Sequence, residues 1–237
     1  MYAFIFGIRT IQSIIDYQPQ RIVRLIFSEY PKFLNRKQLH IPYEIWEKNT
    51  FKQVFGKATS NQGLCLISKQ FPYQKLKSID LNKIYLCIII NEIENPGNLG
   101  RAFRSSFLLN ANLIMITKNK TTPISPMAEK VATGYASRIP VVQISNIYKT
   151  ITQLKKNGFW IIGSCTNRNS YSINNFQFPN KIALIIGNEV SGIPNKIKNK
   201  CDFIVSIPTL NKESLNASDA LLIFLFEISK KNEIPLC

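Results

Sequence analysis

The stretch that decides the fold runs from residue 84 to residue 105 and reads Ile-Tyr-Leu-Cys-Ile-Ile-Ile-Asn-Glu-Ile-Glu-Asn-Pro-Gly-Asn-Leu-Gly-Arg-Ala-Phe-Arg-Ser. Its first part, 84–90, is apolar almost throughout, which is typical of a strand buried on both faces. Its second part places Asn95 before Pro96. That pair favours a helix start, because an Asn side chain can accept from the free N–H groups there and Pro lacks the N–H that would stay unpaired. We therefore expect a buried strand, a polar loop and a helix.

The same pattern recurs through the rest of the chain. We expect strands over 84–90, 113–117, 159–164, 182–187 and 203–207, and helices over 96–109, 126–136, 147–157, 194–199 and 217–230. Apolar strands that alternate with helices indicate an α/β fold with a mostly parallel sheet covered on both faces. Ligands of such sheets bind at the carboxyl ends of the strands.

The N-terminal part has a different organisation. Its periodicities predict a helix over 7–15, strands over 21–27 and 63–67, and an amphipathic helix over 42–55 that carries Trp46 and Phe51. The polar stretch 68–80 contains a proline and has little periodicity, which is typical of a connection. We therefore expect a small α/β domain over 1–72 and a larger domain over 82–237, joined by a linker over 73–81.

The charge is strongly unbalanced. Thirty Lys and Arg residues oppose fourteen Asp and Glu residues, so the formal net charge is +16. Such a surface attracts polyanions. Heavy use of Ile, Asn and Lys also points to an AT-rich genome, which by itself raises the number of lysines. The charge alone therefore does not decide whether the partner is a nucleic acid.

Several classes of protein are excluded or disfavoured. The longest apolar runs are far shorter than the roughly 20 residues that cross a bilayer, so we expect no membrane span. The N-terminus resembles neither a signal peptide nor a transit peptide, which predicts a cytoplasmic protein, with a mature organellar form left open. Five scattered cysteines and a single histidine, His40, offer no zinc-ligand set, so we expect no metal. Ser-His-Asp chemistry would require His40 as its base.

Three polar loops follow predicted strands. In the first, Gly97 and Gly100 permit close approach of a ligand or helix, and Arg101 and Arg104 suit a phosphate. A capped helix with solvated arginines would explain the same residues.

The second loop reads Gly187-Asn-Glu-Val-Ser-Gly192, which lets backbone amides approach a ligand and offers one carboxylate; an ordinary turn is the alternative. The third loop, 208–220, leads into the last helix, whose cap we expect at Asn216 with Asp219 in its first turn. Three such loops at strand ends in one domain together predict a binding site.

In this order the three loops resemble the signature motifs of the SpoU (TrmH-like) family of RNA ribose 2′-O-methyltransferases. The residues that carry the first motif are Pro96, Asn98, Gly100 and Arg104, with Asn95 where the family has Asp; the second is carried by Gly187, Glu189 and Gly192, and the third by Ile207, Pro208, Ser214, Leu215, Asn216, Ser218 and Ala220. The N-terminal part resembles the small RNA substrate-binding domain of this family, with Phe6-Gly-Ile8 at its start and Asn61-Gln-Gly63 where His-Gln-Gly is common.

The resemblance implies a knotted (trefoil) α/β methyltransferase domain, a homodimer and the cofactor S-adenosylmethionine. It implies cofactor contacts by Gly187, Asn188, Gly192, Ile207, Leu215 and Asn216, and catalytic roles for Arg104, Asn98, Glu189, Ser214 and Asn216. The family's proposal for the residue matching Arg104 is a general base. A clamp on the neighbouring phosphate is the alternative, because a guanidinium stays protonated.

The resemblance also implies RNA as the partner. Large-subunit (23S) ribosomal RNA guanosine is the first expected target and transfer RNA the second; an RNA-binding relative that has lost catalysis and serves ribosome assembly is a different class of function. Two departures from the motifs concern the cofactor loop. Five residues separate Pro208 from Ser214 where six are usual, and Asp219 stands where an apolar residue is common.

Overall fold

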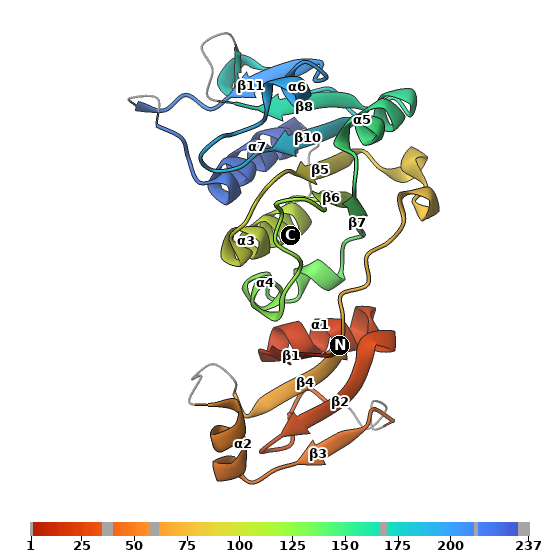
Figure 1. Ribbon diagram of the computed structural model, residues 1–237, viewed down its shortest axis with the longest axis vertical. Coiled ribbons are helices and arrows are strands. Elements are labelled where there is room, and N and C mark those ends of the chain that lie inside the picture. The colour runs from red at the N-terminus through yellow and green to blue at the C-terminus, as the bar shows by residue number, and fades with distance from the viewer. Residues whose placement is uncertain (1, 35–39, 57–61, 166–169, 211–212, 232–237) are drawn as a thin grey trace.

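A computed structural model describes residues 2–34, 40–56, 62–165, 170–210 and 213–231 (Figure 1). Within these ranges the strands form two separate sheets, one of seven strands and one of four. The larger sheet lies in the upper part of Figure 1 and the smaller sheet in the lower part. Among the helices of these ranges, none combines the length and the apolar character needed to span a membrane.

The seven-stranded sheet has the order β7-β6-β5-β10-β8-β11-β9, and each of its pairs is parallel. Its strands are β5 (Leu86–Ile90), β6 (Leu113–Thr117), β7 (Val141–Ile144), β8 (Trp160–Ser164), β9 (Tyr171–Ser172), β10 (Ile182–Ile186) and β11 (Phe203–Ser206). β5, β6 and β10 are buried along their whole length. The predicted α/β fold with a mostly parallel sheet is therefore confirmed.

Helices cover both faces of this sheet. On one face lie α3 (Pro96–Leu108), α4 (Pro126–Val131) and α7 (Ala217–Lys231), whose apolar side chains join the larger core cluster. On the other face lie α5 (Ile147–Lys156) and α6 (Asn195–Lys198). The central strands β5, β6 and β10 thus present apolar side chains to both cores, which explains why the sequence shows them as continuous apolar runs without alternation.

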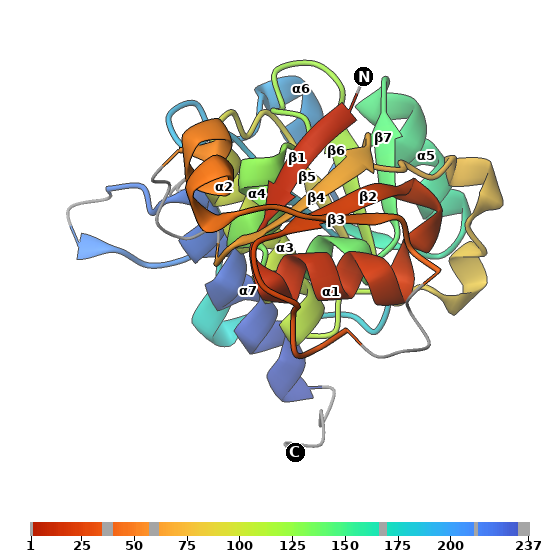
Figure 2. The ribbon, with the colours of Figure 1, turned by 90° about the horizontal axis from the view of Figure 1, so that it is seen from below.

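The four-stranded sheet has the order β1-β4-β2-β3. It is formed by β1 (Tyr2–Phe6), β2 (Ile22–Phe27), β3 (Tyr43–Ile45) and β4 (Leu64–Lys69), with α1 (Ile8–Tyr17) and α2 (Lys48–Phe55). In Figure 2, α1 and α2 lie on opposite sides of these strands. The cluster around α1 contains Ile11, Ile14 and Leu66, whereas the cluster around α2 is smaller and centres on Phe51.

A buried ion pair connects the region of the small sheet to α4, which packs on the large sheet. Arg21, just before β2, donates from Nη1 and Nη2 to the two carboxylate oxygens of Glu129 on α4, both at 2.9 Å. Both side chains are only 2% exposed. Gln18 and Ser68 accept further hydrogen bonds from Arg21, and Ser13 on α1 donates to the Gly134 carbonyl at 2.7 Å. The small sheet is therefore fixed against α4 through hydrogen-bonded contacts.

Some predicted elements were wrong. The single helix expected over 42–55 is the strand β3 followed by α2, because Glu47 has extended backbone angles (φ −59°, ψ 143°) and β3 pairs with β2. β1, β7 and β9 were missed. The helix expected over 126–136 ends at Val131, since Thr133 and Gly134 have φ of 51° and 87°. The connection over 73–81 contains only short 3-10 turns, and Gln74 forms a β-bridge with Val142.

Candidate functional site

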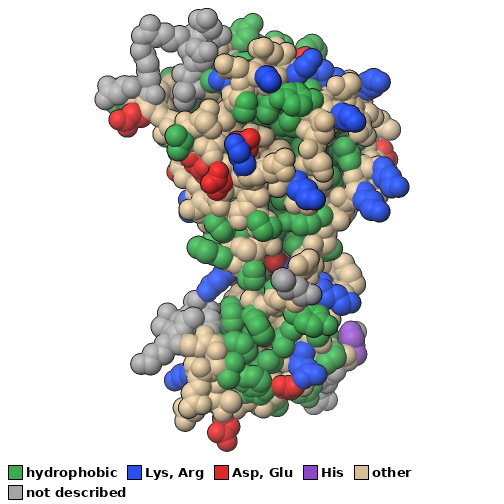
Figure 3. Space-filling model, viewed as in Figure 1, with side chains coloured by type: hydrophobic (Ala, Val, Ile, Leu, Met, Phe, Trp, Pro, Cys, Tyr) green, Lys and Arg blue, Asp and Glu red, His purple; other side chains and the backbone are tan. Residues whose placement is uncertain are grey.

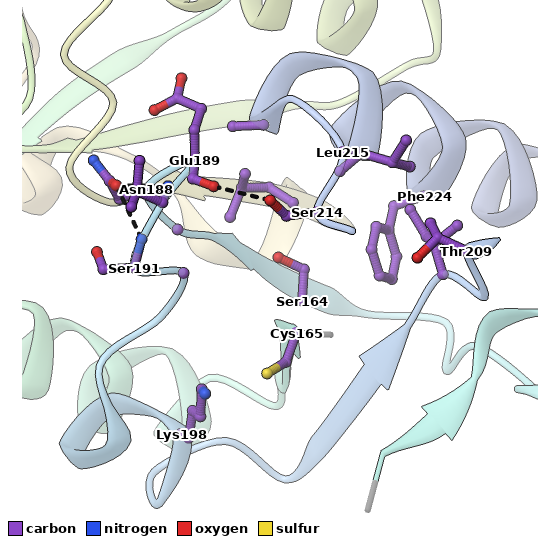
Figure 4. Close-up of a pocket in the computed structure, with 17 residues that line it drawn as sticks. Ser164, Cys165, Asn188, Glu189, Ser191, Lys198, Thr209, Ser214, Leu215 and Phe224 are labelled. Carbon is purple, nitrogen blue, oxygen red and sulfur yellow. Dashed lines mark hydrogen bonds between the residues drawn. The ribbon is translucent and has the colours of Figure 1, made fainter. Parts of the chain in front are cut away.

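An open cavity lies where the carboxyl ends of β8, β10 and β11 meet. The space between its walls, counted together with the open solvent at its mouth, is about 730 Å³. Its lining comes from the loops after all three strands and from the start of α7 (Figure 4): Ser164, Cys165, Ile186, Gly187, Asn188, Glu189, Val190, Ser191, Gly192, Lys198, Ile207, Thr209, Ser214, Leu215, Ala217, Ala220 and Phe224. This position agrees with the rule that ligands of parallel sheets bind at the carboxyl ends of the strands.

The loop after β10 folds back tightly on itself. The N–H of Gly192 donates to the Asn188 carbonyl at 2.9 Å, and the N–H of Asn188 donates to the Gly192 carbonyl at 3.2 Å. A Cβ at Gly187 would lie 2.3 Å from the carbonyl carbon of Gly192, and Gly192 has a φ of +63°. Both positions therefore require glycine, for close approach in one case and for backbone conformation in the other.

Asn188 holds this loop in place. Its Oδ1 accepts hydrogen bonds from the N–H groups of Val190 and Ser191, and its Nδ2 donates to the Glu92 carbonyl at 2.9 Å. The hydroxyl of Ser214 donates to the Glu189 carbonyl at 3.4 Å, which joins the second loop to the third (Figure 4). The Asn188 side chain is thus used for positioning, while the backbone of the loop faces the cavity.

A chain of polar contacts links all three loops. Asn98 Nδ2 donates to Glu189 Oε1, and Asn98 Oδ1 accepts from Arg101 Nη2. Arg101 Nε donates to Ser218 Oγ at 3.0 Å, and Ser218 Oγ donates to Asn216 Oδ1 at 2.7 Å. Asn98 is buried, with 5% of its surface exposed. Arg101 stands at the centre of this chain, between the first and third loops.

The two predicted helix caps are confirmed. Asn95 Oδ1 accepts from the N–H groups of Gly97 and Asn98 at 2.7 and 3.2 Å, and Pro96 occupies the first position of α3. Asn216 Oδ1 accepts from the Ser218 N–H at 2.9 Å, with Asp219 in the first turn of α7. These caps fix the starts of α3 and α7, which carry the polar residues of the first and third loops.

The structure brings together most of the residues predicted for the site. Seven of them line the cavity: Gly187, Asn188, Glu189, Gly192, Ile207, Ser214 and Leu215. Asn98 and Asn216 do not line it but join it through the polar chain. Arg104 is exposed on α3, one turn beyond Arg101, and forms no hydrogen bond or ion pair with the described residues. Of the motif residues, Asn61 lies outside the described residues, as do 211–212 of the third loop.

Sequence reasoning missed several residues of the cavity wall. Ser164 is the last residue of β8 and Cys165 follows it, so the rule that ligands bind at strand ends could have identified them. Lys198 lies on α6, and Phe224 lies on α7 within a continuous apolar face. No pattern in the sequence separates either residue from an ordinary helical position.

The thiols have the character of core residues. Burial raises the pKa of Cys65 to about 12 and also raises the pKa of Cys87. Burial and the nearby Asp202 carboxylate raise the pKa of Cys201 to about 12. These three side chains are therefore neutral thiols at physiological pH and poor nucleophiles. Among the described residues no group of three His, Cys, Asp or Glu side chains could hold a metal ion.

Comparisons with known proteins agree with this geometry. Residues 85–226 match the model of the SpoU rRNA Methylase family. The chain is 30% identical over 250 residues to the 23S rRNA (guanosine-2'-O-)-methyltransferase RlmB of Blochmanniella floridana, covering 98% of this chain and 96% of that protein. It is 32% identical over 145 residues to a putative TrmH family tRNA/rRNA methyltransferase of Staphylococcus aureus, covering 61% of this chain and 58% of that protein.

Solved structures show the same fold over nearly the whole chain. The SpoU methyltransferase AviRb from Streptomyces viridochromogenes, in complex with AdoMet, superposes with a TM-score of 0.80 at 20% identity, covering 97% of this chain and 89% of that one. An AdoMet-bound rRNA methyltransferase from Sinorhizobium meliloti superposes with a TM-score of 0.79 at 19% identity, covering 98% and 88%. The polar contacts that link the three loops and the family match lead to one conclusion: the chain belongs to the SpoU rRNA methylase family.

Proposed function

We propose that the protein is an S-adenosylmethionine-dependent methyltransferase that acts on a ribose 2′-hydroxyl of RNA, on a guanosine of 23S rRNA. The observation that carries the proposal is that two of the family-specific loops line one cavity at the strand ends, and that the first loop is hydrogen-bonded to the second through Asn98 and Glu189. The relative from Blochmanniella, named for 23S rRNA guanosine, matches this chain along its full length. A solved tRNA-modifying enzyme covers only 64% of the chain, which favours ribosomal RNA over transfer RNA.

The residues of the cavity fit the cofactor. The walls contributed by Ile207, Leu215 and Phe224 are apolar and suit an adenine ring, while Gly187 and Gly192 expose backbone groups without side chains. Asn188, at the cavity wall, and Asn216, which lies between the lining residues Leu215 and Ala217, complete the proposed cofactor contacts. When bound, S-adenosylmethionine supplies an electrophilic methyl group on a sulfonium centre.

The polar chain from Glu189 to Asn216 positions the reacting ribose in this proposal. Asn98 is held by Glu189 on one side and Arg101 on the other, so its amide has a fixed orientation. Ser214 and Asn216 contribute hydroxyl and amide groups at the start of α7. Positioning of this kind can lower a barrier by up to roughly 7–11 kcal/mol in favourable cases.

We assign Arg104 the role of a phosphate clamp. A guanidinium is always protonated in proteins, so it cannot accept the proton of the ribose hydroxyl. It can bind the neighbouring phosphate and stabilise negative charge that develops on the ribose oxygen. Arg104 is exposed and has no hydrogen-bond partner among the described residues, which leaves its donors available for RNA.

We also propose a homodimer. Leu222 and Phe226 lie one turn apart on the outer side of α7 and are 48% and 52% exposed. A large apolar pair at this spacing on one helix fits an interface with another helix. α7 packs against α3, which carries Arg104, so a dimer through α7 would bring the partner subunit close to the site. Leu222→Lys should convert a dimer to a monomer in sedimentation, whereas Val54→Lys on α2 should leave it dimeric.

The finer features of the fold are part of the same proposal. A late strand, β10, lies between β5 and β8, which supports the trefoil knot that the family resemblance implies. The two sheets support a division into an RNA substrate-binding domain over 1–72 and a methyltransferase domain over 82–237, with the linker over 73–81. A cytoplasmic location fits an enzyme of ribosomal RNA; an organellar location is the alternative.

Methyl transfer with a labelled cofactor tests the function. Purified protein is incubated with methyl-labelled S-adenosylmethionine and either 23S rRNA lacking ribose methylation or total tRNA. The RNA is then digested to nucleosides. The proposal predicts label in 2′-O-methylguanosine from 23S rRNA. Label from tRNA alone would mean that transfer RNA is the substrate. RNA binding without any label would mean that the protein is an inactive RNA-binding relative.

A further inference from the structure

The small sheet leaves part of one face uncovered. α1 packs on the opposite face through Ile11 and Ile14. On this face, α2 covers one end with Phe51 and Phe55. Beyond that end, Tyr2 and Phe4 of β1 are 63% and 51% exposed. Figure 3 shows hydrophobic side chains gathered on the viewed side of the small sheet, with basic side chains beside them.

The strand register assembles a defined patch here. Tyr2 pairs with Lys69, Phe4 pairs with Ile67, and Ile67 pairs with Arg24 on its other side. Residues directly opposite each other in antiparallel strands point to the same face. These five residues therefore form one surface, which we call the β1–β4–β2 face. It combines two exposed aromatic rings with two cations.

The side chains of this face make few contacts with the rest of the described protein. The ring of Phe4 contacts Phe55 at a centroid distance of 5.8 Å, but about half of its surface stays in water. Arg24 forms an ion pair with Glu44, and both side chains are more than a third exposed. Such a pair contributes little to stability, so Arg24 can exchange it for a phosphate. Lys69 forms no ion pair within the described ranges.

The chemistry of the patch matches unpaired RNA. Alternate residues of one strand lie roughly 7 Å apart, so Tyr2 and Phe4 can each stack on one of two successive bases of an extended strand. Stacking on aromatic rings with cations along the phosphates is how single strands are bound, whereas paired bases in a duplex expose no faces. The exposed Lys69 at the end of β4 disfavours a protein interface, whose cores are depleted in lysine.

We propose that the β1–β4–β2 face binds an unpaired stretch of the RNA substrate, with the rings of Tyr2 and Phe4 stacked on bases and Arg24 and Lys69 contacting phosphates. This inference rests on the proposed function for the identity of the RNA. It assigns recognition of unpaired nucleotides to a surface separate from the cofactor cavity.

Anisotropy titrations with a labelled single-stranded RNA of ten nucleotides, and with a duplex of equal length, test the proposal. The double variant Tyr2→Leu/Phe4→Leu keeps apolar bulk but loses both rings. Its Kd for the single strand should rise about 10-fold or more, because stacking on one base accounts for roughly that factor. Phe4→Trp should bind like the wild type. Tyr148→Leu, which removes an exposed ring on α5, is the matched control and should also bind like the wild type.

A second variant examines the cations independently of the rings. Lys69→Gln should reduce the slope of log Kd against log salt by about 0.7, the value for one phosphate contact on a single strand. Titration with S-adenosylmethionine should give the same affinity for all variants.

Three results would overturn the proposal: an unchanged Kd in the double variant, an equal loss of duplex binding, or a changed sedimentation coefficient, which would mean that a second copy of the chain covers this face. Failure of the proposed function is distinguishable. Ring-dependent RNA binding without methyl transfer would contradict the function alone, and methyl transfer with an unchanged KM for RNA in the double variant would contradict this inference alone.

Discussion

The two sheets of this protein differ in how completely they are covered, and the difference matches a division of labour. The seven-stranded sheet has apolar cores on both faces, and a cavity lies among the loops at the ends of its strands. The four-stranded sheet has a larger apolar cluster beneath α1 than beneath α2, and it exposes the aromatic rings of Tyr2 and Phe4 on β1. A closed sheet offers only its ends for binding, whereas a half-open sheet can bind through a face.

The largest expected effect concerns Arg104. If the large sheet carries the chemistry, Arg104→Ala should lower kcat by about 10²- to 10³-fold, which is typical for loss of one charge-stabilising donor. The affinity for S-adenosylmethionine should change only a few-fold, because Arg104 does not line the cavity. Single-turnover kinetics and calorimetry measure the two quantities. Equal loss of both would make Arg104 a structural residue.

The contact between the two regions should dominate stability. Arg21→Met leaves the Glu129 carboxyl buried without its partner, which should reduce the free energy of unfolding by about 3–5 kcal/mol. The double variant Arg21→Met/Glu129→Leu should recover most of that loss, since it removes both buried charges. Denaturant unfolding measures both variants. A loss below 1 kcal/mol in the single variant would mean that the two regions are held together by other contacts.

A smaller effect is expected from Arg101, which joins the first and third loops. Arg101→Ala frees the Asn98 amide and breaks the link to Ser218, so we expect a roughly 10-fold lower kcat with unchanged KM for the cofactor. Arg101→Lys keeps the charge but not the fork of donors, and should recover little. Lys156→Ala, on the exposed side of α5, is the control. Full activity of Arg101→Ala would remove Arg101 from the positioning network.

The smallest expected effect is on the salt dependence of RNA binding, which should differ between variants in the small and the large region. Binding of non-specific RNA should weaken linearly in log salt, because each neutralised phosphate releases counterions. Lys69→Gln should lower this slope, and Lys156→Ala on the large region should not. A flat salt response in the wild type would exclude the basic surface as the source of RNA affinity.

The sequence predicted the large region better than the small one, for a physical reason. β5, β6 and β10 are apolar along their length, and their helices begin at Asn and Pro caps, so pattern and structure agree. β1 has the same length as these strands but alternates in burial between the two faces of its sheet, and β3 has only three residues before α2. Local periodicity does not separate such strands from a neighbouring helix.

The site, too, was predicted only in part from the sequence. Motif spacing identified the loops around the cavity, but the role of Arg101 depends on contacts with Asn98 and Ser218, which lie on two different helices. Lys198 reaches the cavity from α6, which carries no motif residue, and Phe224 reaches it from α7, beyond the last motif residue Ala220. Only the packing of α6 and α7 onto the sheet brings them there.

The most direct test of the account is calorimetric titration of the full chain with S-adenosylmethionine, for the wild type and for Ser164→Phe, whose ring would fill the cavity. We predict saturable binding near one cofactor per protomer for the wild type and no measurable binding for the variant, with unchanged circular dichroism. Equal binding by both proteins, or no binding by folded wild-type protein, would contradict the assignment of this cavity to the cofactor.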